Sequence, residues 1–276
     1  MSTISAKDVK QLRDQTGAGM MDCKKALMES NGDIEKAIEY LRKKGQKLSD
    51  KRADRETKEG VVLAIVSDDS SKGVTVKLSC ETDFVAKNED FVNLTREFAD
   101  IALKSFPASL EELLALPYGD ITIGDKVVEQ TGVIGEKINL AEYARLEAPM
   151  VTSYIHMGNK AAVLVGLNKA SDNFVDAGRD VAMQIAAMHP IAVDKNGVDQ
   201  AIIDKELEIG KEIALKEGKP EAMIEKIAMG KLNRYFKDNT LLAQAFVKDS
   251  KKNVGDYLNS IESGLTVVEF KHVKLG

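Results

Sequence analysis

The pattern that most constrains the fold is a unit of two short strands and a helix, which occurs twice in the chain. Residues 61–79 contain two apolar runs separated by a polar turn, and residues 91–107 follow with helical spacing. Residues 150–168 again contain two strand-like runs, and residues 180–190 continue a second helix that also ends at a proline. Two strands and one helix bury little apolar surface by themselves. We therefore expect the two units to be related and to pack together.

The N-terminal segment has a different character, because its pattern is helical throughout. Ser5 and Asp8 form a capping-box-like pair at the start of a first helix. Residues 16–19 and 31–33, which are rich in glycine, separate it from a second and a third helix, and Gly45 is expected to end the third. Three helices of this size resemble a ubiquitin-associated bundle. The charged tract that follows shows no apolar periodicity and is interpreted as a linker.

The C-terminal part carries a second kind of insertion. Residues 199–244 contain two amphipathic helical stretches separated by Gly218-Lys219-Pro220, which predicts an antiparallel helical hairpin that projects as an arm. Residues 246–258 are expected to form a helix, and residues 265–275 a last strand that returns to the second unit. For residues 134–147 the pattern leaves helix and strand open.

The sequence therefore predicts an α+β protein with two related core subdomains, each with an antiparallel sheet. We expect a ubiquitin-associated-like helical domain at residues 1–55 and a first core subdomain at residues 56–148. The second core subdomain comprises residues 149–198 together with residues 245–276, and the coiled-coil hairpin at residues 199–244 is inserted within it.

Composition argues against several classes of function. The net charge is -5 with 30% charged residues, so the chain lacks the clustered positive charge that binds phosphate backbones, and we expect no direct nucleic-acid partner. No apolar run is long enough to span a bilayer, and the first residues show no signal-peptide segment. Cys23 and Cys80 have no metal-binding or disulfide spacing. We therefore expect a cytoplasmic protein with reduced thiols and no membrane partner.

Catalytic and cofactor motifs are missing as well. Residues 131–137, TGVIGEK, do not match a phosphate-binding loop in spacing or in their last position, and no GxGxxG follows a strand. The three histidines are far apart in sequence, with no second metal ligand near any of them. Cys80 at a strand end is more typical of a buried apolar filler than of a nucleophile. We expect no enzymatic activity, no catalytic residue, no metal and no cofactor.

The junction after the second strand offers the most specific candidate site. Thr82, Asp83, Phe84 and Val85 lie where a strand gives way to a helix expected to begin near Ala86. On these residues alone, a simple structural role explains the pattern better: Thr82 or Asp83 caps the helix and Phe84 packs beneath it. The alternative is that the turn presents a carboxylate and an aromatic ring outward to another protein. In the N-terminal bundle, Met20 and Met21 cannot both face inward, so one of them should be exposed.

Four strings resemble bacterial elongation factor Ts. They are TGAGMMDCKKAL at residues 16–27, GDIEKAIEYLRKKG at residues 32–45, ETDFVAKN at residues 81–88 and FVKDSKKNVGDYL at residues 246–258. The resemblance covers nearly the whole chain in the same order. Some members of the family carry a further C-terminal helical module, whereas the last expected strand of this chain lies shortly before Gly276, so the resemblance leaves any contact made by that module open.

The resemblance implies a guanine-nucleotide exchange factor for elongation factor Tu, bound in its GDP-bound and nucleotide-free states. In the family, the motif matched by Thr82, Asp83, Phe84 and Val85 disturbs the Mg²⁺ and phosphate side of the partner's nucleotide site. The N-terminal domain is expected to grip a helix of the partner through Leu12, Met20 and Met21. His156, on the first strand of the second core subdomain, is expected to touch another partner domain.

Two other classes compete with this interpretation. A generic adaptor, with a helical bundle and a helical arm joining two partners, explains both ends of the chain but leaves the duplicated core unexplained. A cysteine hydrolase would require Cys80 as its nucleophile, so Cys80→Ala would abolish its turnover. Nucleotide-release assays with elongation factor Tu discriminate the exchange factor from both.

Overall fold

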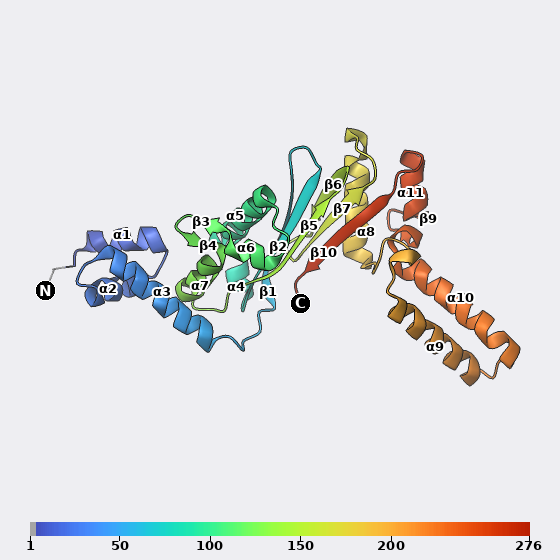
Figure 1. Cartoon of the computed structure of the whole chain (residues 1–276), viewed down its shortest axis with the longest axis horizontal. Helices are drawn as coiled ribbons and strands as arrows, with labels where there is room; N and C mark the ends of the chain where they lie inside the picture. The colour runs from blue at the N-terminus through green and yellow to red at the C-terminus, as the bar shows by residue number, and fades with distance from the viewer. Residues whose placement is uncertain (1–3) are drawn as a thin grey trace.

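The computed structural model describes residues 4–276. The chain forms an elongated molecule with a helical bundle at one end, two sheets in the middle and a helical hairpin at the other end (Figure 1). The α+β fold class with antiparallel sheets is confirmed. No helix within residues 4–276 is both long and apolar enough to cross a membrane.

The N-terminal bundle consists of α1 (Ala6–Thr16), α2 (Met20–Glu29) and α3 (Ile34–Lys51). The capping box of Ser5 and Asp8 begins α1, and Gly17, with φ +70°, ends it in the left-handed conformation. The sequence predicted that Gly45 would end α3, and this is wrong. The helix continues for six more residues, to Lys51. A Cβ on Gly132 of α7 (Ile123–Ile134) would lie 2.7 Å from the Gly45 Cα, so a glycine is needed at this close contact between the two helices. The expected linker therefore shortens to residues 52–58.

The two predicted units form two three-stranded sheets with equivalent topology. The first sheet has the order β1-β2-β5, with β1 (Glu59–Val66), β2 (Lys72–Cys80) and β5 (Asn139–Glu147). The second has the order β6-β7-β10, with β6 (Met150–Ile155), β7 (Ala161–Leu167) and β10 (Val267–Lys274). In both, the third strand pairs antiparallel with the second strand of the hairpin. The internal duplication and the returning last strand are therefore present in the structure.

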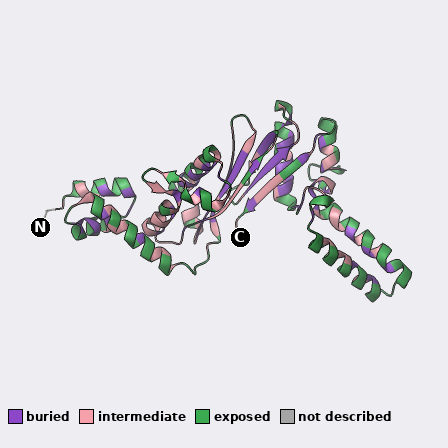
Figure 2. Ribbon diagram, viewed as in Figure 1, coloured by how far each residue is buried: buried purple, intermediate pink, exposed green. Residues whose placement is uncertain are grey.

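The sheets pack face to face and carry helices on their outer faces (Figures 1 and 2). Alternate residues of β1 divide between two cores: Leu63 faces α5 (Glu89–Ser105), and Val62 faces the second sheet. A Cβ on Gly73 would lie 2.8 Å from the Leu164 side chain and 2.9 Å from that of Val151, so the two sheets are closely packed at this point. The outer helix of the second unit is α8 (Val175–Met188). Both sheets are therefore buried on two sides.

Each outer helix ends at a non-glycine residue in the left-handed conformation that is followed by proline. Phe106 has φ 47°, ψ 51° and precedes Pro107, while His189 has φ 48°, ψ 52° and precedes Pro190. Their identical placement extends the similarity of the two units from the strands to the helix ends.

The segment between α5 and β5 resolves the ambiguity left by the sequence. It contains α6 (Leu110–Ala115), the short strands β3 (Pro117–Tyr118) and β4 (Ile121–Thr122), and α7 (Ile123–Ile134). Residues 134–147 are thus the end of a helix, a loop and a strand. Helix α7 packs on α3 and so attaches the bundle to the first sheet.

The arm consists of α9 (Gln200–Lys216) and α10 (Glu221–Asn239), joined at Gly218 with φ +69°. Its surface is mostly exposed (Figure 2). The helix predicted over residues 246–258 is wrong in its first half. Strands β8 (Ala245–Phe246) and β9 (Asp249–Asn253) form a small hairpin, and α11 (Val254–Ile261) starts only after Asn253 caps it. The polar run Asp249–Asn253 offers no apolar face to bury in a helix.

Candidate partner-binding site

The junction after β2 is a separate turn and not the start of the long helix. Residues Asp83–Ala86 form the single turn α4, and α5 begins only at Glu89. The break occurs because Asn88 caps α5, its side-chain oxygen accepting the Asp90 N–H at 2.9 Å. The sequence predicted one helix beginning near Ala86, and this is wrong. Ala86 ends the short turn α4, and the long helix begins three residues later, at Glu89.

Phe84 does not pack beneath the helix. Its relative exposure is 83%, whereas Val85 packs against the core of the first unit. Thr82 occupies the N-cap position of α4, yet its side chain accepts no capping hydrogen bond. Neither half of the simple structural explanation therefore holds. The turn presents a large aromatic ring to solvent on a short, anchored element.

Asp83 lies beside this ring and carries a negative charge. The Lys87 ammonium, 2.6 Å from its carboxylate, lowers the pKa of Asp83 below its ordinary value of 3.8. Both side chains of this pair are substantially exposed. An exposed pair of this kind is weak, so an incoming charged group can displace Lys87 and take the carboxylate.

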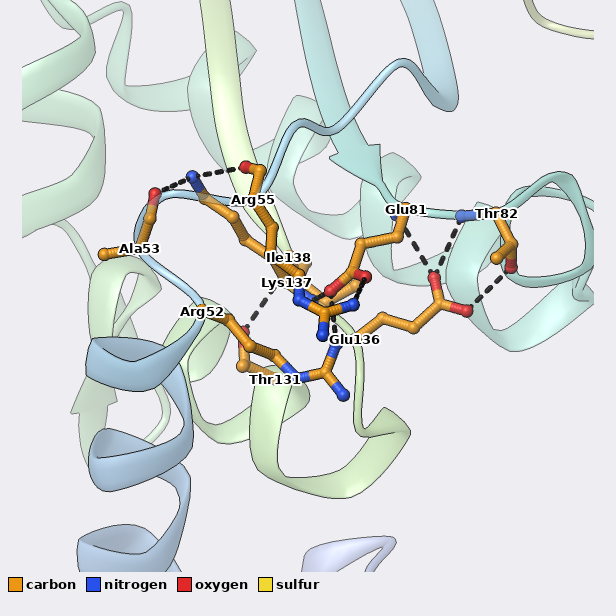
Figure 3. Close-up of polar contacts among 9 residues, drawn as sticks. All are labelled: Arg52, Ala53, Arg55, Glu81, Thr82, Thr131, Glu136, Lys137 and Ile138. Carbon is orange, nitrogen blue, oxygen red and sulfur yellow. Dashed lines mark hydrogen bonds and ion pairs between the residues drawn. The ribbon is translucent and has the colours of Figure 1, made fainter.

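Two carboxylates hold the turn from below (Figure 3). One oxygen of Glu136, in the loop between α7 and β5, accepts the N–H groups of Glu81 at 3.1 Å and Thr82 at 3.0 Å. Its other oxygen accepts the Thr82 hydroxyl at 2.7 Å. The Cys80 thiol adds a contact to the Thr82 carbonyl at 3.1 Å. The backbone leading to Asp83 is thus fixed by hydrogen bonds on both sides.

Glu81 carries this support into the segment after α3. Its carboxylate accepts hydrogen bonds from Arg52 at 2.6 Å, from the Lys137 N–H at 2.6 Å and from Arg55 at 3.1 Å. Partial burial acts to raise the pKa of Glu81, but these three donors outweigh it and hold the pKa below its ordinary value of 4.5. The Lys137 ammonium in turn binds the Ala53 and Arg55 carbonyls. No local pattern predicts this network, although Glu136 and Lys137 form a charged pair after Gly135 in an otherwise apolar stretch.

The candidate residues of the bundle divide into a core residue and two surface residues. Leu12 is fully buried, a position from which it supports the bundle. Met20 is 59% exposed and Met21 77% exposed, so both face solvent where only one was expected to. Met28 on the same helix is also exposed and was missed. A groove runs from Gly17 in the bundle to Val85 beside the turn, with Phe91 and Val133 among its lining residues.

His156 lies apart from these residues. It is exposed, and its Nδ1 lies 3.2 Å from the Tyr154 hydroxyl. It was expected on the strand itself, but β6 ends at Ile155, so His156 lies one position beyond it. The turn that carries it is fixed to the first sheet, because the Asn159 carbonyl accepts the Val62 N–H at 2.8 Å. Thus the structure keeps Thr82–Val85 together, places the methionines on the bundle and puts His156 on a third element.

The cysteines have the surroundings of core residues. Both are buried, and burial, aided by the Glu136 carboxylate, raises the pKa of the Cys80 thiol to about 12. A thiol with such a pKa is almost entirely protonated near neutral pH and is a poor nucleophile. His189 and His272, far apart in sequence, stack with ring centroids 5.1 Å apart. In the part of the chain that is described, no cluster of three potential metal ligands occurs.

An exposed ring and carboxylate on a held turn, with exposed methionines on an attached bundle, have the form of a protein that acts by binding another protein. The family model described as "Elongation factor TS" matches residues 81–276. The chain belongs to the elongation factor Ts family and is a translation elongation factor.

Full-length relatives support the same assignment. The chain is 55% identical to elongation factor Ts of Christiangramia forsetii and 53% identical to that of Flavobacterium psychrophilum, over all of both chains in each case. It is 50% identical to elongation factor Ts of Porphyromonas gingivalis, covering 99% of this chain and 98% of the relative. The similarity therefore includes the N-terminal bundle, which precedes the region matched by the family model.

Proposed function

We propose that the protein is the guanine-nucleotide exchange factor for elongation factor Tu, and that it acts without catalytic residues or a cofactor of its own. The observation that carries the proposal is the exposed Phe84 beside ionised Asp83 on the held turn. In this proposal Thr82, Asp83, Phe84 and Val85 enter the partner's nucleotide domain from the Mg²⁺ and phosphate side. In this proposal nucleotide exchange takes place in the cytoplasm, and the factor binds neither nucleic acid nor a membrane directly.

The mechanism follows from shape and charge. A rigid aromatic ring shifts the elements that it contacts, and a carboxylate competes for donors and for the metal near the phosphates. Mg²⁺ bridges nucleotide and protein, so its displacement removes a large attractive term and GDP leaves. The factor then holds the nucleotide-free partner until GTP binds. Factor and nucleotide weaken each other's binding to the same extent, because the coupling is reciprocal.

We assign the remaining contacts to separate parts of the chain. Met20 and Met21, both exposed on α2, grip a helix of the partner, with Leu12 as internal support. His156 touches a different partner domain from the second sheet. We divide the chain into the helical domain at residues 1–55, the first core subdomain at residues 56–148, the second core subdomain at residues 149–198 with 245–276, and the hairpin at residues 199–244.

The reciprocal coupling gives a direct test. Purified factor and nucleotide-free elongation factor Tu should elute as one complex in gel filtration, and millimolar GDP should separate them. The factor should also accelerate the release of a fluorescent GDP from the partner. A complex that survives the added GDP intact, or a release rate unchanged by the factor, would exclude the exchange function.

A further inference from the structure

The turn that carries Asp83 and Phe84 is attached to the core of the first unit through Val85 and Ala86, but its first residues have no side-chain cap. Phe84 is almost free of contacts with the rest of the chain, and α4 is only four residues long. A single helical turn is unstable by itself, since nucleation of a helix is unfavourable. Its N-cap residue, Thr82, uses its hydroxyl as a donor to Glu136 and not as a cap. The residues that lead into the turn, Glu81 and Thr82, are therefore held by a group outside it.

Glu136 is this group. It belongs to the loop between α7 and β5, 54 residues further along the chain than Thr82, and its two oxygens take three donors from Glu81 and Thr82 (Figure 3). In residues 4–276 no lysine or arginine makes an ion pair with it, so the whole carboxylate is committed to this junction. Hydrogen bonds to a charged acceptor are among the strong ones. This is the pattern of a brace and not of a surface ion pair.

We propose that Glu136 is a positioning residue for nucleotide exchange, whose carboxylate fixes the direction in which Asp83 and Phe84 leave the first sheet. The inference rests on the proposed function, in which these two side chains enter the partner. Glu136 itself touches neither the partner nor the nucleotide. Glu81 extends the brace, because its carboxylate accepts the Lys137 N–H next to Glu136 and the guanidinium groups of Arg52 and Arg55.

The chain offers a matched control for this brace. Asp125 holds Thr122 at the start of α7 by the same chemistry, accepting the Thr122 N–H at 3.1 Å and its hydroxyl at 2.8 Å. Neither Thr122 nor Asp125 is a candidate site residue, and their N-cap leads into the 12 residues of α7. Asp125→Ala should therefore lower stability as much as Glu136→Ala or more, and leave GDP release unchanged.

The test measures two quantities separately: the affinity for nucleotide-free elongation factor Tu, and the rate of fluorescent GDP release at saturating factor. Glu136→Ala should lower the saturating rate by about tenfold, the loss expected for hydrogen bonds to a charged group. Its affinity should change much less. Glu136→Gln should recover most of the rate, because its amide oxygen still accepts the two N–H groups. Thr82→Val, which replaces the hydroxyl with a methyl group of similar size and so removes one of the three hydrogen bonds to Glu136, should lower the rate less than Glu136→Ala.

A double-mutant comparison decides whether Glu136 acts through the turn. In a chain that already carries Asp83→Ala and Phe84→Ala, adding Glu136→Ala should slow release no further. An undiminished additional loss would overturn the inference, as would a wild-type rate for Glu136→Ala. If instead Asp83→Ala with Phe84→Ala releases GDP as fast as wild type, the proposed entry of the turn into the partner is itself wrong. The two failures are therefore distinguishable.

Discussion

Phe84→Ala should separate exchange activity from stability, because the ring contributes to one and hardly to the other. Complete burial of a phenylalanine side chain is worth about 1.5–3 kcal/mol, and Phe84 is 83% exposed. Less than a fifth of that value is at stake, so the free energy of unfolding should fall by under about 0.5 kcal/mol. A buried interface anchor, in contrast, contributes about 2 kcal/mol or more to the complex, which corresponds to roughly 30-fold.

The assay is stopped-flow release of fluorescent GDP from elongation factor Tu, with and without Mg²⁺, alongside a chemical denaturation curve. Phe98→Ala is the internal reference, because Phe98 is fully buried in α5 and its truncation should cost about 3–5 kcal/mol of stability. Leu215→Ala, an exposed apolar truncation on the arm, should change neither quantity. If the turn acts through the metal, the defect of Phe84→Ala should shrink when Mg²⁺ is chelated. A defect of equal size without Mg²⁺ would refute the metal-displacement role, and a stability loss near that of Phe98→Ala would refute the exposed placement.

Two further predictions concern the bundle and the brace. Met21→Ala should weaken the complex by about 1–3 kcal/mol with almost no change in melting temperature. Leu12→Ala should instead lower the free energy of unfolding by about 2–5 kcal/mol. Equal losses of stability in the two variants would show that Met21 is a core residue and not an interface residue. The lowered pKa of Glu81 stabilises the fold fully above pH 4.5, and this contribution is lost as pH falls through the lower folded pKa. Glu81→Gln should therefore reduce stability by about 1–2 kcal/mol at pH 7, and the difference from wild type should shrink by pH 3; a difference independent of pH would contradict the role of the charge.

The sequence predicted the parts of the fold that depend on local pattern. The strand pairs, the two outer helices, the arm with its turn at Gly218 and the returning last strand were all expected from periodicity and turn residues. Gly45 shows where such reasoning fails. A glycine late in a helix signals a C-cap locally, and only the presence of Gly132 against it reveals a close helix contact. The missed break after Ala86 is similar, since the cap at Asn88 competed with continuous helical spacing.

The candidate site was only partly predictable for a related reason. The order of residues 82–85 indicated a turn that could present a ring and a carboxylate, but not whether Phe84 was buried or exposed. Glu136, which holds the residues before the turn, is distant in sequence and has no motif of its own. The stacking of His189 on His272 could not be predicted either, because it joins the end of a helix to the last strand. Long-range polar contacts leave no periodic trace in a sequence.

The two strand-strand-helix units differ in what separates the helix from the third strand. In the first unit this connection holds α6, β3, β4 and α7, and in the second it holds the arm and α11. Strands β5 and β10 nevertheless take equivalent places beside β2 and β7. The position of the third strand is thus set by its pairing with the second strand and not by the length of the connection. The entropic cost of closing a loop rises only slowly with loop length. That connection is therefore where this architecture accommodates additional elements. In the first unit it includes α7, which packs against the N-terminal bundle, and in the second unit it includes the arm.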